Sequence, residues 1–211
     1  MRLFCASLLT LLTLPSLVLA QAELSVYGIA NQPSESQVQG IDPGGAGAFD
    51  FSTDWSVPSA SGIRLTYWQS DEVGFGVDVN TTGVTADPAD LSGTGIEDLA
   101  LERGTSILTI NAFRRWESSS LGMAPYVGAG LGVSFPQIRF DGGGVTTDER
   151  QLAGPAMQIV AGARYSVGNN VSLFGEMQGA YSINRGDLQS GGALDTNILT
   201  NGVNFGITLG F

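Results

Sequence analysis

The chain has no histidine, and its one cysteine is Cys5. All of its basic residues are arginine, so lysine is absent as well. Without histidine the chain cannot form a Ser-His-Asp or Cys-His catalytic group, and it lacks the usual zinc ligands. A single cysteine excludes an internal disulfide framework. The balance of 20 acidic against 9 basic residues argues against nucleic acid as a partner.

Residues 1–20 differ from the rest of the chain. They carry one charge, Arg2, then an apolar run, and they end on the small-residue pattern Val18-Leu19-Ala20. This layout predicts a secretory signal peptide that is cleaved before Gln21 and takes Cys5 with it. The alternative is a transmembrane helix, but the run is short and Pro15 interrupts it. We therefore expect a signal peptide over 1–20 and one domain over 21–211.

The rest of the sequence repeats one pattern, in which short segments of alternating apolar and small or polar residues are separated by polar connections. In residues 73–80, the side chains of Val73, Phe75, Val77 and Val79 fall on one face of a strand and Asp78 on the other. No segment has sustained helical periodicity. We count eight such segments: 23–30, 61–69, 73–80, 105–115, 124–134, 153–165, 171–182 and 197–211.

The connections alternate in length. Those around 70–72, 118–120 and 168–170 are short, whereas 31–60, 81–104, 135–152 and 183–196 are long. Short periplasmic turns and long extracellular loops are typical of outer-membrane barrels. The sequence therefore predicts an all-β, eight-stranded antiparallel transmembrane β-barrel in the outer membrane of a Gram-negative cell. The alternative is a soluble ligand-binding barrel, which would place the apolar face inside.

The last segment alternates up to Phe211, with Val203, Phe205, Ile207 and Leu209 on the same face. A closed barrel pairs its last strand with its first, so such a segment need not be a loose tail. The pattern resembles the C-terminal signature of bacterial outer-membrane barrels, which implies that the barrel-assembly machinery reads Phe211. The alternative is a soluble chain that happens to end on phenylalanine. We expect a monomer whose partners are outer-membrane lipids and lipopolysaccharide.

Four charged residues share the small-residue face of their segments and are expected inside the barrel: Arg64, Asp78, Arg164 and Glu176. Because buried charges must be paired, they are predicted to form an internal salt-bridge network. The functional alternative is a polar pocket that opens toward the loops. Outside the barrel, Trp68 and Trp116 lie near segment ends and fit an aromatic girdle at the membrane interface.

Most of the acidic residues fall in the four long connections. Charged loops keep a surface in water, which is one explanation. Alternatively, loop carboxylates bind a divalent cation that bridges them to lipid phosphates, since Ca²⁺ and Mg²⁺ prefer oxygen ligands. Asp98 and Glu102 are the candidate metal ligands, although their spacing is not that of an EF-hand.

Four stretches together resemble the outer-membrane lipid A oxidase family, whose members are small eight-stranded barrel proteins of alphaproteobacteria. They are residues 51–55, 106–116, 125–136 and 150–211, and the resemblance is most specific from Leu152 onward. It implies oxidation of the proximal glucosamine of lipid A to 2-aminogluconate, with O₂ as co-substrate and a divalent cation, but no haem and no nucleotide. The family's His-x-Lys stretch is missing here, where the chain reads VNTTGVTAD over 79–87.

The resemblance also points to residues. Its motifs match Glu176 in FGE, and Asp195 and Asn197 in LDTN. Combined with the expected interior charges, this gives Glu176 and Asp78 as candidate catalytic residues. Arg64, Asp195 and Asn197 are candidate substrate-binding residues.

The sequence leaves three functions open. The first is a lipid A oxidase. The second is a non-enzymatic barrel for envelope integrity or adhesion, which includes an inactive relative of the oxidases. The third is a soluble ligand-binding barrel.

Overall fold

A computed structural model of the chain describes residues 22–42, 47–102, 106–116, 122–142, 144–187 and 191–211. The predicted signal peptide over 1–20 lies outside these ranges. Within them the chain forms no helix long and apolar enough to cross a membrane. The described elements are strands, and every pairing between them is antiparallel, which confirms the all-β antiparallel prediction. They are β1 (Ala22–Pro33), β2 (Ser36–Ile41), β3 (Ala48–Thr53), β4 (Trp55–Trp68), β5 (Val73–Ala86), β6 (Ile96–Glu102), β7 (Ile107–Arg115), β8 (Met123–Ser134), β9 (Gln137–Gly142), β10 (Val145–Arg150), β11 (Gly154–Ser166), β12 (Val171–Asp187) and β13 (Ala193–Gly210).

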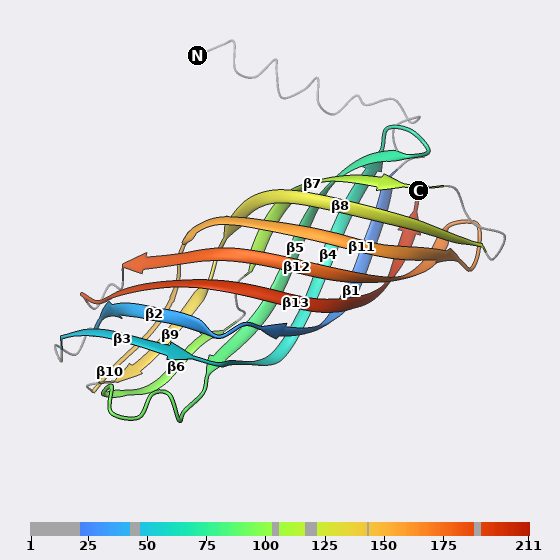
Figure 1. Ribbon diagram of the computed structural model, residues 1–211. Coiled ribbons are helices and arrows are strands. Elements are labelled where there is room, and N and C mark those ends of the chain that lie inside the picture. The colour runs from blue at the N-terminus through green and yellow to red at the C-terminus, as the bar shows by residue number, and fades with distance from the viewer. Residues whose placement is uncertain (1–21, 43–46, 103–105, 117–121, 143, 188–190) are drawn as a thin grey trace, which may run out of the picture.

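Eight of these strands pair in a closed cycle. The order is β1, β4, β5, β7, β8, β11, β12 and β13, and β13 pairs back onto β1. At the closing pair Tyr27 lies opposite Gly206, and the hydroxyls of Ser25 and Thr208 lie 2.8 Å apart. The cycle forms the barrel wall that Figure 1 shows, in which each of the eight strands pairs with a neighbour on both sides.

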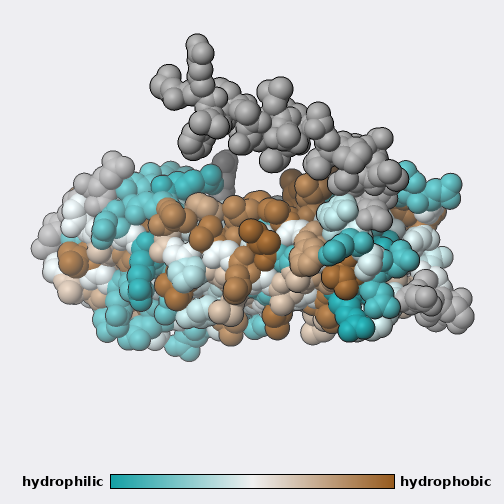
Figure 2. All heavy atoms as spheres, turned by 90° about the horizontal axis from the view of Figure 1, so that it is seen from above, coloured by the Kyte–Doolittle hydropathy of each residue, from teal (hydrophilic) through white to brown (hydrophobic). Residues whose placement is uncertain are grey.

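The apolar side of each barrel strand faces outward. On β5, Val77 is 44% exposed, whereas its neighbour Asp78 is fully buried in the interior. The same alternation runs along β4 and β12, and Figure 2 shows apolar residues gathered over the middle of the barrel surface. An outward apolar band around a polar interior is the pattern of a membrane barrel. A soluble ligand-binding barrel needs the opposite arrangement, so this orientation excludes that alternative.

The two ends of the barrel differ as the connection lengths predicted. At one end the turns are tight: the Gln69 amide donates to the Val73 carbonyl over 2.9 Å, and the Val167 amide donates to the Val171 carbonyl over 3.0 Å. We call this the turn end. The predicted turn at 118–120 lies outside the described residues.

At the other end the long connections are not polar loops, and here the sequence prediction was incomplete. They contain β2, β3, β6, β9 and β10, and the barrel strands also run on beyond their predicted ends, with β12 reaching Asp187. β2 pairs with β13 and with β3. β6 pairs with Val84 and Thr85 near the end of β5 and also with β9, and β9 pairs with β10. We call these five strands, with the strand ends they pair with, the extension. It lies at the left of Figure 1.

The extension has its own apolar core. Leu99 is fully buried and Phe140 is 1% exposed, and the ring of Phe140 stacks on that of Phe49 with centroids 6.1 Å apart. Trp55 belongs to this cluster rather than to the surface. The core therefore covers the interior of the barrel at this end. Its buried residues are Val38, Trp55, Val84, Ala86, Leu91, Ile96, Leu99, Leu101, Ile138, Phe140, Leu194 and Ile198.

Candidate functional site

Three of the predicted interior charges meet at the middle of the barrel. Arg64 on β4 donates from Nε to Asp78 Oδ2 on β5 over 2.8 Å. Its Nη1 and Nη2 donate to the two carboxylate oxygens of Glu176 on β12, over 2.9 and 2.7 Å. All three side chains are buried, and Glu176 is only 2% exposed. Arg64 thus makes a bidentate hydrogen bond with one carboxylate and a third hydrogen bond with another, which is the geometry best suited to a buried arginine.

Neutral donors complete the shell around the two carboxylates. The Tyr27 hydroxyl donates to Asp78 Oδ1 over 2.5 Å, and the Tyr126 hydroxyl donates to Glu176 Oε2 over 2.6 Å. Asn204 Nδ2 donates to Glu176 Oε1 over 2.7 Å. These donors offset the extra negative charge that one arginine leaves between two carboxylates.

The same network extends through the side-chain amides of the interior. Gln158 donates to Asp78 Oδ2 over 3.0 Å and to Asn111 Oδ1 over 2.9 Å, while its own oxygen accepts from Asn80 and Gln178. Every strand of the closed cycle therefore contributes at least one member. We call this set the central network: Tyr27, Arg64, Asp78, Asn80, Asn111, Tyr126, Gln158, Glu176, Gln178 and Asn204.

Aromatic rings fill the space that small residues leave in the interior. The guanidinium carbon of Arg64 lies 5.3 Å from the ring centre of Tyr27 and 5.1 Å from that of Phe113. Tyr27 packs over Gly62 and Phe113 over Gly128, where any side chain would collide with the ring. The glycines on the inward face therefore make room for the rings, and the rings hold Arg64 in a cation–π sandwich.

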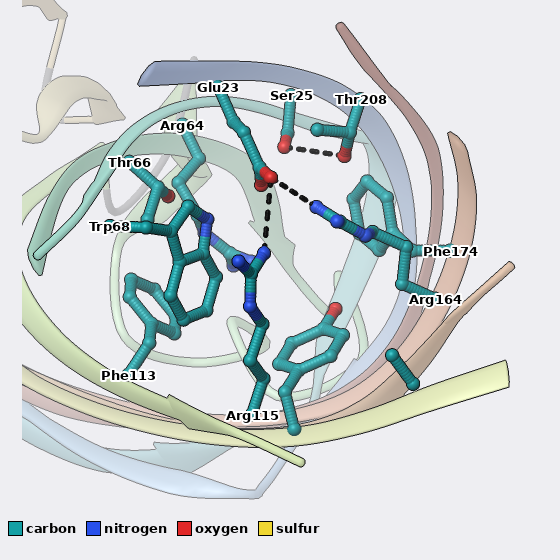
Figure 3. Close-up of a pocket in the computed structure, with 12 residues that line it drawn as sticks. Glu23, Ser25, Arg64, Thr66, Trp68, Phe113, Arg115, Arg164, Phe174 and Thr208 are labelled. Carbon is teal, nitrogen blue, oxygen red and sulfur yellow. Dashed lines mark hydrogen bonds and ion pairs between the residues drawn. The ribbon is translucent and has the colours of Figure 1, made fainter. Parts of the chain in front are cut away.

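Below the central network, toward the turn end, a second ionic group lines a small chamber (Figure 3). Glu23 accepts from Arg164 over 2.5 Å and from Arg115 over 3.3 Å. Arg115 also lies over Trp68, with its guanidinium carbon 3.9 Å from the ring centre. The chamber measures about 30 Å³ and the buried indole N–H of Trp68 has no partner in the structure, so the space suits one or two water molecules.

The structure thus brings together Arg64, Asp78 and Glu176, as the interior-charge prediction required. Arg164 also faces inward, but it pairs with Glu23 near the turn end and not with the central network. The prediction for Trp68 was wrong, because this ring is buried inside the barrel instead of lying in an aromatic girdle. Trp116 is exposed at the turn end, next to Arg114, as a girdle residue would be.

The other two candidate substrate-binding residues lie elsewhere. Asp195 is on the part of β13 that belongs to the extension, and it pairs with Arg185 over 2.8 Å on the exposed surface. Asn197 is exposed on the same strand. Asn204, which does contact Glu176, is seven residues further along β13, which corresponds to about 23 Å at the rise of a strand.

Of the two candidate metal ligands, Asp98 is the one whose side chain the structure describes. Asp98 lies 3.7 Å from Arg139, so its charge is already offset by a guanidinium. The side chain of Glu102 lies outside the described residues. Among the side chains that the structure does describe, no three acidic, histidine or cysteine residues lie close enough together to hold a metal ion. The divalent cation that the oxidase resemblance implies stays a prediction.

The sequence prediction missed several members of the two ionic groups. Tyr27 and Glu23 belong to the first barrel strand, and Tyr126 and Gln158 lie on the fifth and sixth strands of the cycle. The signal was available, because each lies on the same side of its strand as glycine or another polar residue. Reading every strand for inward polar residues, and not only for charges, would have found them.

No protein-family model and no curated protein matches the chain. The solved structures that are similar to it include the outer membrane protein OprG from Pseudomonas aeruginosa, with TM-score 0.54 and 14% identity, over 91% of this chain and 97% of that one. The outer membrane protein AlkL, solved in lipid bilayers, gives TM-score 0.51 and 17% identity over 90% of each chain. Neisserial surface protein A gives TM-score 0.50 and 15% identity, over 90% of this chain and 97% of that one.

These similarities establish the fold and nothing finer. The chain has the fold of the outer-membrane β-barrels, which confirms the predicted fold class. At such identities a shared fold does not carry a shared activity. The resemblance to the lipid A oxidases has no matching family model to support it.

Proposed function

We propose that the chain is a non-enzymatic outer-membrane barrel, which anchors the extension at the cell surface and contributes to envelope integrity or adhesion. The observation that carries this proposal is that the interior is filled along its length. The central network occupies the middle and the apolar core of the extension covers one end. An eight-stranded barrel has an interior just wide enough for side chains, and the described side chains fill its middle, with only a chamber of about 30 Å³ near the turn end.

The orientation follows from the two ends. The turn end faces the periplasm and the extension faces the outside, as in other barrels with short and long connections. In this proposal residues 1–20 direct export, Phe211 takes part in recognition by the barrel-assembly machinery, and the barrel is a monomer among outer-membrane lipids and lipopolysaccharide. The exposed apolar side chains of the barrel wall, such as Ile110 at 70% and Leu131 at 71%, support placement in a membrane.

The proposal predicts that the barrel does not conduct. In planar lipid bilayers, the purified protein should give no current steps above those of the protein-free membrane. A general porin inserted under the same conditions is the positive control. Insertion is verified separately by the faster migration of the folded form in unheated detergent gels. Regular single-channel steps from folded protein would contradict a filled interior.

Lipid A oxidation is the second candidate function, and one observation favours it. Arg64, Asp78 and Glu176 converge in a buried cluster, and coupled buried ionisable groups are concentrated at functional sites. However, both oxygens of Glu176 already accept hydrogen bonds from Arg64, Tyr126 and Asn204. In the non-enzymatic proposal these bonds are structural, and Glu176 stabilises the barrel instead of reacting.

Loss of the chain should therefore change the envelope and not its lipid. We expect a deletion strain to become more sensitive to detergent, while the mass spectrum of its lipid A stays the same with and without O₂.

Glu176→Ala should lower the unfolding free energy by about 3 kcal/mol, because it leaves Arg64 with one partner. The control is Glu72→Ala, which removes an exposed carboxylate at the turn end.

Two outcomes would favour the oxidase. One is a gain of one oxygen on the proximal sugar of lipid A that requires both the chain and O₂. The other is loss of that gain in a folded Glu176→Ala protein. The first result would show oxidase activity in a chain without histidine, and the second would place that activity at Glu176.

A further inference from the structure

A pocket opens on the outer wall of the barrel where β5 changes partner. Residues 73–80 of β5 pair with β7, but Val84 and Thr85 pair with β6 of the extension. The wall therefore has a seam between the extension and the start of β7. The pocket at this seam measures about 310 Å³, which is at the lower end of the sizes of small-molecule sites. Its lining includes Val79, Thr81, Ser106, Leu108, Phe135 and Arg150.

The pocket lies at the edge of the apolar band. On β5 the outward residues run from Val77 to Val79, both exposed, and the next outward residue is Thr81. On β7 they run from Ile110 to Leu108, and the next position in that direction is Ser106. On both strands the apolar side chains thus give way to a hydroxyl within about 7 Å. In a bilayer this is the level at which lipid acyl chains meet their headgroups.

Arg150 stands out among the arginines that the structure describes. The six others, Arg64, Arg114, Arg115, Arg139, Arg164 and Arg185, each lie within 4.0 Å of a carboxylate. Within the described residues Arg150 has no such partner. Its neighbours in β10 are occupied elsewhere, since Asp148 accepts from Gln137 and Glu149 accepts from Gln151. Since no described carboxylate pairs with it, this guanidinium at the lip of the pocket can receive an external anion.

We propose that this seam pocket binds the phosphate group of a membrane lipid in the leaflet on the extension side. Arg150 supplies the charge and the paired hydrogen-bond donors that match phosphate oxygens. The Ser106 hydroxyl donates to the Thr81 hydroxyl over 3.4 Å, which leaves the proton of Thr81 as a further donor in the same lining. Val79, Leu108 and the ring of Phe135 offer an apolar wall to the lipid chain. The inference rests on the proposed function only in that it requires the barrel to sit in a membrane.

The experiment uses the full-length mature protein in phosphatidylcholine nanodiscs that contain phosphatidic acid or, in a parallel sample, diacylglycerol. Retained lipids are counted by native mass spectrometry after the protein is released from the disc. We expect phosphatidic acid to be retained and diacylglycerol not, because the two differ only in the phosphate. Arg150→Gln should reduce retention about tenfold, the factor that corresponds to loss of one charged hydrogen-bond pair.

Arg185→Gln is the matched control, because it makes the same change on the extension surface away from the pocket and should retain phosphatidic acid as the unaltered protein does. Equal retention by Arg150→Gln would overturn the proposal. Displacement of the lipid by inorganic phosphate alone would overturn the lipid part of it, since the site would then take free phosphate. Failure of the unaltered protein to fold into the nanodisc would instead reject the membrane placement itself, and the inference with it.

Discussion

An Arg64→Ala protein should lose about 3–5 kcal/mol of unfolding free energy, the cost of leaving buried charges without their partner. Asp78 and Glu176 would keep their buried positions but lose the one cation between them. The tyrosine and amide donors that remain can satisfy hydrogen bonds, but they cannot offset two negative charges. The measurement is denaturant unfolding of the protein in lipid vesicles, followed by tryptophan fluorescence.

Two comparisons make this test specific to the buried charges. Arg185→Ala removes an arginine from the exposed pair with Asp195, and surface pairs contribute only about 0–1 kcal/mol. Adding Asp78→Asn and Glu176→Gln to Arg64→Met removes all three charges and should restore most of the lost stability. If Arg64→Ala unfolds at the same denaturant concentration as the unaltered protein, the central network does not hold the barrel together.

The second large effect is expected in the extension. Phe140→Ala should cost about 3–5 kcal/mol, as is typical when a fully buried aromatic side chain is truncated. Phe140 sits in the apolar core of the extension and stacks on Phe49, so its removal leaves a cavity between β3 and β9. Because the barrel wall has its own network, the loss should fall on the extension and leave the barrel folded.

Limited proteolysis of intact vesicles measures this difference. In Phe140→Ala protein we expect faster cleavage within β2, β3, β9 and β10, while the barrel keeps its heat-dependent gel mobility. Ile41→Ala is the control, because Ile41 belongs to the extension but is 51% exposed. If the extension of Phe140→Ala protein is cleaved no faster than that of the unaltered protein, the apolar core of the extension is not what orders these strands.

The sequence was sufficient to predict the barrel because its evidence is local. Whether a side chain faces in or out follows from its position in a strand, so the outward face of Val77 and the inward face of Asp78 can be read directly. The inward facing of Arg64, Asp78 and Glu176 follows from the same rule, but their meeting does not, because Arg164 also faces inward and pairs with Glu23 instead. The rule also predicts that Tyr126 and Gln158 face inward, because each shares the side of its strand that carries glycine or polar residues.

The extension could not be predicted in the same way. β6 is ordered in part by β9, which comes from a different connection, and β2 is ordered by β13 at the far end of the sequence. Such pairings leave no mark in any short window of residues. Trp68 shows a related limit, because an aromatic residue near a strand end suits both a girdle and a buried cation–π contact. Only its partner Arg115 decides between them.

The central network has a consequence for how the chain folds. Its members come from every strand of the cycle, and Ser25 and Thr208 at the closing pair are 183 residues apart in the sequence. The contacts between Arg64 and Glu176 join β4 to β12, which are linked on the shorter side of the cycle only through the closing pair of β1 and β13. Contacts of such long range make folding slow. Interactions formed only after the transition state chiefly slow unfolding, so the barrel should be long-lived once closed.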